Sequence, residues 1–344
     1  MSRLALACLL ASLACGCAGS REAERRILEF RGPTMGSTYS VKVVTGRAGL
    51  ADAADLDRQI RADLARITAL MSTWDAGSEL SRFNRFTGSD PFPLSPETFE
   101  VFRWSRDIAA ETGGALDVTV GPLVDAWGFG PSGRRARFPT DAEIARLRQA
   151  VGMHLLELDE AAMTVRKRRP EVACDFSALA PGYAVDRLST RLVDRGIKDF
   201  LVDVASELRV QGRNEKGERW QVAIERPDEA GQIGERIVRL SDAAIATSGD
   251  YRNVVEIDGV QATHILDPRT GRPIGSHLAS VTVMDRLSVR ADAFATALMV
   301  LGPHDGLALA ERLNLAAMFL VREGTDGFLE RTTTRFDTLT KEKD

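Results

Sequence analysis

Cys174-Asp-Phe-Ser-Ala-Leu-Ala-Pro-Gly-Tyr-Ala-Val-Asp186 joins a short apolar run to the start of a helix. The run at 171–174 predicts a buried strand, and apolar residues at helical spacing predict a helix from about Pro181 onward, where proline costs no hydrogen bond. The small residues between them leave the backbone accessible, and free N–H groups at a helix start favour phosphate. The junction is therefore expected to form an anion site beside Asp175, or else a purely structural turn capped by that acid.

Composition sets broad limits on function. The 344 residues are 44% hydrophobic and 27% charged, as in an ordinary globular protein that buries a large core. Since 45 Lys and Arg stand against 49 Asp and Glu, the net charge is −4. A charge this small provides no whole-chain field for nucleic acid or an anionic membrane.

The N-terminus contains an apolar run, 4–14, that follows Arg3 and is too short to span a bilayer. It predicts a secretory signal peptide. The run ends in Leu13-Ala-Cys-Gly-Cys17, which resembles a bacterial lipobox. Cys17 is the expected lipid acceptor and Cys15 the alternative, and a plain signal peptide without lipid is the remaining option.

These features divide the chain into three parts. Residues 1–16 are expected to be a lipoprotein signal peptide, 17–26 a polar tether and 27–340 one folded domain. We therefore expect a bacterial membrane-anchored lipoprotein that faces the periplasm or the cell exterior. After cleavage Cys174 is the only cysteine besides Cys17, so no disulfide can form within the domain.

The pattern of the domain predicts an α+β fold. Helical spacing predicts helices over 56–71, 95–111 and 141–150, from Pro181, and from Val289, with one more helix near the end. Short apolar runs predict strands at 39–44, 155–158, 164–168, 200–204, 207–211, 220–224, 236–240, 244–247, 254–257 and 279–284, and two short strands before a polar tail from 331. Loops are expected at 32–38, 71–84, 112–130 and 264–271. A strand-rich second half favours one domain with mixed or antiparallel sheets and packed helices.

Two oxygen donors lie four residues apart in Ala291-Asp-Ala-Phe-Ala-Thr296. Asp292 and Thr296 therefore project from one helix face. A carboxylate and a hydroxyl without His or Cys select a hard cation, and so few protein ligands suit Mg²⁺ held jointly by substrate phosphates. The same spacing is also common on ordinary helices.

His264 is the candidate general base. It precedes Asp267-Pro-Arg-Thr-Gly271 in a polar loop, and the reference pKa of histidine lies near working pH. A structural histidine is the alternative. No Cys/His metal spacing, Walker loop, nucleophile elbow or dinucleotide-binding glycine motif occurs in the sequence, which argues against those common classes of site.

Seven ordered motifs together resemble the FAD:protein FMN transferase family, the ApbE flavin transferases. They cover nearly the whole chain after the signal peptide: Gly32-Pro-Thr-Met-Gly-Ser-Thr38, Met71-Ser-Thr-Trp-Asp75 with Ser78–Asn84, Gly113-Gly-Ala-Leu-Asp117 through Asp125, Gly182-Tyr-Ala-Val-Asp186, Ala246-Thr-Ser-Gly-Asp-Tyr251, His264-Ile-Leu-Asp-Pro-Arg-Thr-Gly271, and Ala291-Asp292 with Thr296.

The resemblance implies a reaction and a set of site residues. FAD would bind with its pyrophosphate beside Mg²⁺, and FMN would pass to a Thr or Ser hydroxyl of an acceptor flavoprotein, a membrane redox subunit by resemblance, with release of AMP. Asp292, Thr296 and the carbonyl of Ala178 would hold the ion, and His264 would stand near the reacting phosphate. Residues implied to bind FAD are Met35, Trp74, Ala115, Leu116, Asp117, Asp175, Pro181 and His264.

Two departures from the family pattern bear on the function. Pro181 stands where the family usually has Lys, and Ala205-Ser-Glu207 stands where it usually has Gly-Gly-Glu. Larger residues at a close backbone approach are expected to weaken FAD binding. Two alternative functions follow: an FAD pyrophosphatase that gives FMN and AMP, and a non-catalytic flavin-binding lipoprotein.

Overall fold

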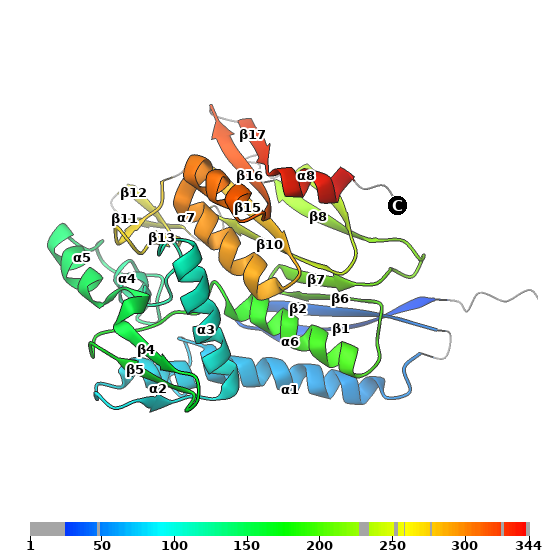
Figure 1. Cartoon of the computed structure of the whole chain (residues 1–344), viewed down its shortest axis with the longest axis horizontal. Coiled ribbons are helices and arrows are strands. Elements are labelled where there is room, and N and C mark those ends of the chain that lie inside the picture. The colour runs from blue at the N-terminus through cyan, green and yellow to red at the C-terminus, as the bar shows by residue number, and fades with distance from the viewer. Residues whose placement is uncertain are drawn as a thin grey trace, which may run out of the picture.

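A computed structural model describes residues 25–46, 49–226, 234–250, 254–257, 259–275, 277–324 and 327–341. The expected signal peptide, the lipid acceptor Cys17 and most of the tether lie outside the described residues. The expected α+β class is confirmed, because helices cover antiparallel sheets within one described body (Figure 1).

The main sheet of the described chain has eight strands, and all of its neighbours are antiparallel. Its order is β1 (Arg26–Thr34), β2 (Ser37–Thr45), β6 (Phe200–Val204), β7 (Glu207–Gln211), β10 (Ala243–Gly249), β15 (Leu278–Asp285), β16 (Ala316–Glu323) and β17 (Gly327–Thr332).

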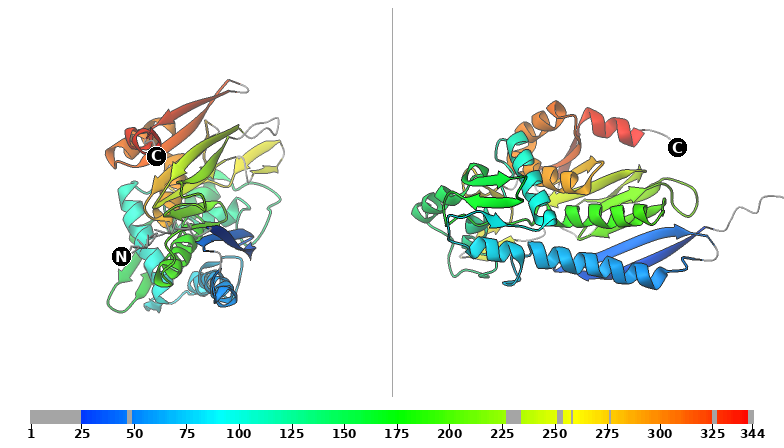
Figure 2. Two further views of the ribbon diagram at one scale, coloured as in Figure 1. Left: turned by 90° about the vertical axis from the view of Figure 1, so that its right-hand side faces the viewer. Right: turned by 60° about the horizontal axis from the view of Figure 1, so that its bottom comes forward.

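Each face of this sheet buries its own apolar layer. One face packs on α1 (Ala53–Met71), α6 (Ala180–Asp194) and α7 (Ser288–Arg312), as the views in Figures 1 and 2 show. The other face packs on the hairpin of β8 (Trp220–Arg226) and β9 (Gly234–Leu240) and on α8 (Thr334–Lys341), whose Phe336 is fully buried. The alternation of side chains along the strands produces these two layers.

The remaining elements gather at one end of the main sheet. They include the small sheet of β3 (Phe92–Pro93), β5 (Thr164–Lys167) and β4 (Leu156–Asp159), and the hairpins of β11 (Val254–Ile257) with β12 (Val260–Thr263) and of β13 (Leu266–Asp267) with β14 (Arg272–Pro273). Helices at this end are α2 (Glu79–Arg85), α3 (Pro96–Glu111), α4 (Gly121–Ala126), α5 (Asp141–Leu147) and two 3₁₀ turns, Arg148–Ala150 and Met153–Leu155 (Figure 1).

Long periodic segments follow the sequence closely. The buried residues of α1 are the ones whose spacing predicted the helix: Leu56, Ile60, Leu64, Ile67 and Met71. Among the described helices α7 is long and apolar enough to cross a membrane, yet 56% of its most apolar window is buried inside the fold. It is the core helix against β10 and β15.

The predicted strand at 171–174 is wrong. The segment is buried, but only Ala173 forms a bridge, to Val120. The Asn84 side chain replaces a neighbouring strand, because its Oδ1 accepts the Cys174 N–H at 2.7 Å and its Nδ2 donates to the Cys174 carbonyl at 2.8 Å. A side-chain amide thus satisfies the backbone where a sheet was expected.

All four predicted loops and the tail contain regular structure. Most of 32–38 belongs to β1 and β2, which a two-residue turn at Met35-Gly36 connects. The segment 71–84 contains most of α2, 112–130 contains α4, and 264–271 contains β13. The tail from 331 includes α8, and the two expected C-terminal helices are the two parts of α7, which meet at a break at Gly302 before Pro303.

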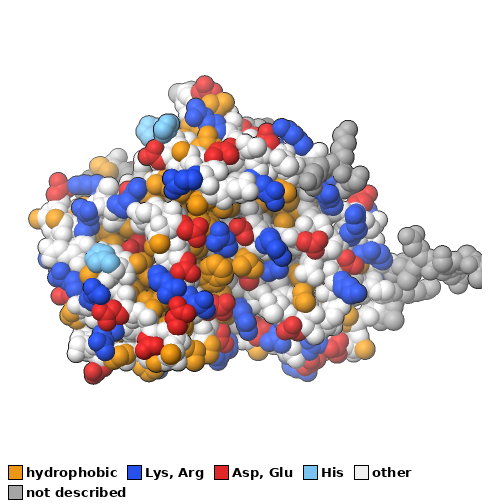
Figure 3. Space-filling model, viewed as in Figure 1, with side chains coloured by type: hydrophobic (Ala, Val, Ile, Leu, Met, Phe, Trp, Pro, Cys, Tyr) orange, Lys and Arg blue, Asp and Glu red, His pale blue; other side chains and the backbone are white. Residues whose placement is uncertain are grey.

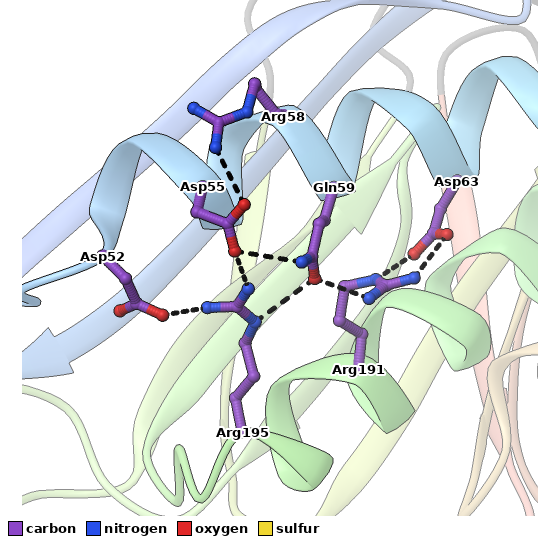
Figure 4. Close-up of polar contacts among 7 residues, drawn as sticks. All are labelled: Asp52, Asp55, Arg58, Gln59, Asp63, Arg191 and Arg195. Atoms are coloured by element: carbon purple, nitrogen blue, oxygen red, sulfur yellow. Dashed lines mark hydrogen bonds and ion pairs between the residues drawn. The ribbon is translucent and has the colours of Figure 1, made fainter.

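An exposed ionic network joins α1 to the C-terminal half of α6 (Figure 4). Arg191 pairs with both carboxylate oxygens of Asp63 and donates to Gln59 Oε1 at 2.7 Å. Arg195 pairs with Asp52 and Asp55. These contacts fix α1 along α6, at the end of α6 that is far from its junction with 174–179.

Surface charge is mixed on the face shown in Figure 3, where Lys and Arg are interspersed with Asp and Glu. This face therefore presents no extended field of one sign, as the net charge of −4 suggests.

Candidate active site

One cavity of about 680 Å³ lies where the small elements meet the end of the main sheet. The FAD-binding and metal residues implied by the sequence all line it except Met35: Trp74, Ala115, Leu116, Asp117, Asp175, Ala178, Pro181, His264, Asp292 and Thr296. They come from segments more than 200 residues apart, so the fold brings the separate motifs into one cavity.

Two carboxylates tie α6 to α7: Asp292, which is buried and lines the cavity, and Asp186, which is mostly buried behind it. Asp186 on α6 accepts the N–H groups of Ser288 and Val289, both at 3.0 Å, and so caps the start of α7. Asp292 on α7 accepts the Gly182 N–H at 3.1 Å, and so caps the start of α6. We call this pair of contacts the reciprocal cap. Each carboxylate lies at the positive end of the other helix, which stabilises its charge.

Gly182 makes this approach of the helices possible. A Cβ at this position would lie 2.6 Å from the Ser288 carbonyl oxygen and 2.8 Å from the Val289 Cα. Because these are backbone atoms, no rotamer change could relieve the contact. The glycine is therefore required by packing between α6 and α7.

The Ala178 carbonyl lies just before α6, whose N-cap is Leu179. Gly182 is the third residue of the helix, where the N–H has no intrahelical acceptor. It bonds to Asp292, while the next N–H, of Tyr183, bonds to Leu179 at 2.8 Å. Among the hydrogen bonds of the described residues, none is made to the Ala178 carbonyl.

Three oxygen-bearing groups of the cavity wall are of the kind that suits a hard cation. They are the Ala178 carbonyl, the nearly buried Asp292 carboxylate and the Thr296 hydroxyl, whose Oγ1 lies 2.9 Å from Ser248 Oγ. Burial raises the pKa of Asp292 from 3.8 to about 7, against the opposing effect of the Gly182 N–H. The described residues contain no group of three His, Cys, Asp or Glu that could hold a metal.

The N–H groups at the start of α6 are bonded within the protein. The Ala180 N–H bonds to Phe176 at 2.8 Å, position 181 has no N–H, and the Gly182 N–H bonds to Asp292. The anion site beside Asp175 stays a prediction, but the free helix-start donors on which it rested are not present.

Two predicted acids have structural bonds as well as a place in the cavity wall. Asp117 accepts the Thr119 N–H and hydroxyl through Oδ1 and the Met153 N–H through Oδ2, while burial raises its pKa. Asp175 accepts the Ser177 N–H at 2.7 Å. Both carboxylates therefore shape the backbone around the cavity.

Trp74 and His264 lie at the sides of the cavity. The Trp74 side chain is 67% exposed, which leaves its ring face available for stacking. The His264 ring packs edge-to-face on Phe129, with ring centroids 6.3 Å apart. His264 follows β12 in a bend and lines the same cavity as Asp292 and Thr296.

The departures at Ala205 and Ser206 occupy a strained turn. Both residues have positive φ, 56° and 80°, in the two-residue turn that connects β6 to β7. Two left-handed residues in such a turn favour glycine. Met35, with φ of 49°, is the apex of the neighbouring β1–β2 turn at the same end of the sheet, just outside the cavity lining.

Several contributors were missed from the sequence. Phe129 and Arg134 line the cavity from the loop after α4, and Thr247 and Ser248 line it from β10. Lys167 is buried, and its Nζ donates to the Asn84 and Phe86 carbonyls at the end of α2, with its pKa lowered by burial to about 8. The Gly-rich loop was a signal for Phe129, and Asn84, Thr247 and Ser248 lie within the motifs quoted for the family resemblance, whereas nothing local marked Lys167.

Comparison with known proteins gives a clear relationship. Residues 35–319 match the model of the ApbE family. The chain belongs to the ApbE family. This ApbE-family chain is 41% identical to the FAD:protein FMN transferase of Vibrio cholerae, with 97% of each chain covered, and 36% identical to that of Haemophilus influenzae, with 99% and 98% covered.

Solved ApbE structures have the same fold. The flavin transferase ApbE from Vibrio cholerae superposes with a TM-score of 0.84 at 40% identity, covering 92% of this chain and 99% of that one. The apo flavinyl transferase ApbE from Pseudomonas stutzeri gives 0.84 at 40% identity, covering 93% and 98%. The family and the α+β fold that the seven motifs predicted are thereby confirmed.

Proposed function

We propose that this ApbE-family protein transfers the FMN part of FAD to a Thr or Ser hydroxyl of an acceptor protein, and that it needs Mg²⁺. The observation that carries the proposal is the set of three oxygens from Ala178, Asp292 and Thr296 in the wall of a 680 Å³ cavity. Relatives of 36–41% identity are named FAD:protein FMN transferases.

The proposed reaction breaks and forms one bond to phosphorus. The acceptor oxygen bonds to the FMN phosphorus, the bond from that phosphorus to the bridging oxygen breaks, and AMP leaves with the bridging oxygen. The hydroxyl proton passes to His264 or to water. Such transfer needs positioning and charge neutralisation more than covalent work by the protein.

Different residues of the site would hold the metal, bind the flavin and accept the proton. Asp292, Thr296 and the Ala178 carbonyl would hold Mg²⁺, which neutralises charge on the phosphate oxygens when bound. Trp74 offers its ring to the flavin, and Ala115, Leu116, Asp117, Asp175 and Pro181 form the walls. His264 would accept the hydroxyl proton, and Met35 would reach FAD only from outside the cavity lining.

Two alternatives use the same cavity. A pyrophosphatase would pass FMN to water, and a flavin-binding protein would keep FAD intact. The strained Ala205-Ser206 turn and the proline at 181 are the features that favour weaker FAD binding. AMP release that depends on an acceptor separates transferase from both alternatives.

The test incubates the domain from residue 25 with FAD, Mg²⁺ and an extract of membrane proteins, and follows AMP and covalent flavin fluorescence in a denaturing gel. We expect Asp292→Ala to abolish both signals, because it removes the only carboxylate of the ion site. His264→Asn should slow transfer by about 10²–10⁴-fold, the usual value of a general base. If the Asp292→Ala variant transfers FMN at the wild-type rate at every Mg²⁺ concentration, the metal assignment is contradicted.

We also propose attachment to a membrane through lipid on Cys17, facing the periplasm or cell exterior, with a membrane redox subunit as acceptor. The support is the apolar run that ends in Gly16-Cys17. Cys17→Ser should give a protein without acyl chains by mass spectrometry. Acyl chains on that variant would place the lipid on Cys15 instead.

A further inference from the structure

The main sheet is split beside the cavity. On one side β10 pairs with β15 from Ala244 to Gly249. On its other side β10 pairs with β7 only from Ala243 to Ile245. Because β7 begins at Glu207, directly after the Ala205-Ser206 turn, the second half of β10 has no strand beside it on that side among the described residues.

The direction of the backbone groups follows from the pairing. The Asp250 N–H donates to the Ala279 carbonyl of the β15 side. In an antiparallel pair, bonded and non-bonded positions alternate, so Ser248 also points its N–H and carbonyl toward β15. Thr247 and Gly249 therefore point theirs to the open side. The 2.8 Å contact of Thr247 Oγ1 with Thr282 Oγ1 agrees, because side chains are closest at non-bonded pairs.

The cavity passes along this open edge. Ser248 faces α7, since its Oγ lies 2.9 Å from Thr296 Oγ1, and alternation places the Thr247 side chain on the opposite face. Yet Thr247, Ser248 and Gly249 all line the cavity. Residues from both faces can meet one cavity only where the edge of the strand itself is accessible. Main-chain groups along a strand edge that faces a cavity can bond to a ligand there.

We propose that an extended segment of the acceptor protein binds as an added strand beside Thr247–Gly249. The inference rests on the proposed function, which requires a protein hydroxyl to enter this cavity. Strand addition supplies affinity through main-chain bonds and leaves side chains to provide specificity. It also allows one enzyme to accept segments of different sequence.

This placement brings the hydroxyl to the ion site. On its open side Ser248 occupies a non-bonded position, where the opposite residue has its Cα at about 4.5 Å and its side chain on the same face. A Thr or Ser opposite Ser248 therefore extends toward Thr296 and Asp292. The two residues flanking it would bond to Thr247 and Gly249, and the next two would direct their amides away from β10.

Synthetic peptides test which main-chain N–H groups of the bound segment point toward β10, without altering the enzyme. The full domain is incubated with FAD, Mg²⁺ and a pool of 11-residue peptides, each with one central Thr among small and polar residues, and accepted peptides are identified by the mass of FMN. An accepted peptide is then remade with N-methyl amides at the two residues flanking the Thr. The matched control has N-methyl groups two residues away on each side.

We expect methylation of the flanking residues to lower kcat/KM for the peptide about tenfold, the effect of one or two lost hydrogen bonds. The control should stay within about twofold. Equal losses from both patterns overturn the inference, as does AMP release from FAD with no peptide of the pool labelled. If no AMP is released in any reaction, including those that contain membrane extract, the proposed function itself is contradicted.

Discussion

The two halves of α6 are held by opposite kinds of contact. Its N-terminal half meets α7 through the reciprocal cap, a few buried bonds between carboxylates and backbone N–H groups. Its C-terminal end meets α1 through three arginine–carboxylate pairs whose side chains are 20–57% exposed (Figure 4). Ion pairs within reach of solvent contribute little to stability, whereas buried polar groups are costly to leave unpaired. The candidate site therefore lies at the end of α6 whose polar contacts are buried and less replaceable.

Gly182→Ala should have the largest effect. The added methyl would lie 2.6 Å from a backbone oxygen of Ser288, so α6 and α7 must separate. We expect a loss of about 3 kcal/mol in the free energy of unfolding and loss of transfer, since the three oxygens move apart. Urea unfolding and the AMP assay measure the two effects. Gly46→Ala, where φ is not positive and the added Cβ meets nothing within 4 Å, is the control for a glycine change outside the contact.

Asp292 makes the stability of the metal-free protein depend on pH. Its pKa rises from 3.8 to about 7 on folding, so between these values the folded state holds a proton that the unfolded state has lost. Stability should therefore fall as pH rises from about 4 to 7. Mg²⁺ needs the ionised carboxylate and should raise Tm at pH 8 more than at pH 5. Asp292→Asn should flatten the pH profile of Tm and remove the Mg²⁺ effect; a persistent effect would place the ion elsewhere.

Asp186→Asn should weaken the other half of the reciprocal cap. The amide keeps one acceptor oxygen but brings an N–H toward one capped backbone group and loses the charged bond to Arg209 at 2.8 Å. We expect a loss of about 1–3 kcal/mol and a higher Mg²⁺ concentration for half-maximal transfer. Asp194→Asn, on the same helix and exposed, is the matched control. Equal Mg²⁺ requirements in the two variants would show that Asp186 does not position α7.

How much of this the sequence could predict depends on the range of the contact. The helix at 56–71 followed from its own spacing, and the seven motifs identified the family. The Gly182 N–H at the start of α6 bonds to Asp292, a residue more than a hundred positions away. No local pattern contains that contact. The strand at 171–174 failed for the same reason, because its backbone bonds go to the distant Asn84 side chain.

Replacing Ala205 and Ser206 with glycine should stabilise the site end by a smaller amount. Left-handed backbone costs about 1 kcal/mol or more for a residue with a Cβ, and glycine avoids this cost. We expect a higher Tm, and tighter FAD binding by fluorescence quenching if the Ala205 methyl, which lines the cavity, touches the ligand. A Ser206→Gly variant separates the two causes, because Ser206 does not line the cavity. Affinity equal to wild type in the double variant would show that the turn already accommodates FAD.

The ionic network should give the smallest effect. Arg191→Ala and Arg195→Ala each remove exposed pairs to α1, which are worth about 0–1 kcal/mol and are screened by salt. We expect losses below about 1 kcal/mol by urea unfolding, smaller still at 1 M salt, with unchanged transfer. A loss above about 2 kcal/mol, or a fall in transfer rate, would contradict the contrast between the two halves of α6.

The direction of β1 sets how far the cavity lies from the point where the chain enters the fold. The chain enters β1 at Arg26, and nine residues later the Met35-Gly36 turn lies at the cavity end of the sheet (Figure 1). At about 3.3 Å per residue the entry point and the cavity are about 30 Å apart. If lipid on Cys17 anchors the protein, the eight residues from Ala18 to Arg25 add at most about 29 Å when fully extended. The cavity could then reach acceptor hydroxyls up to about 60 Å above the bilayer.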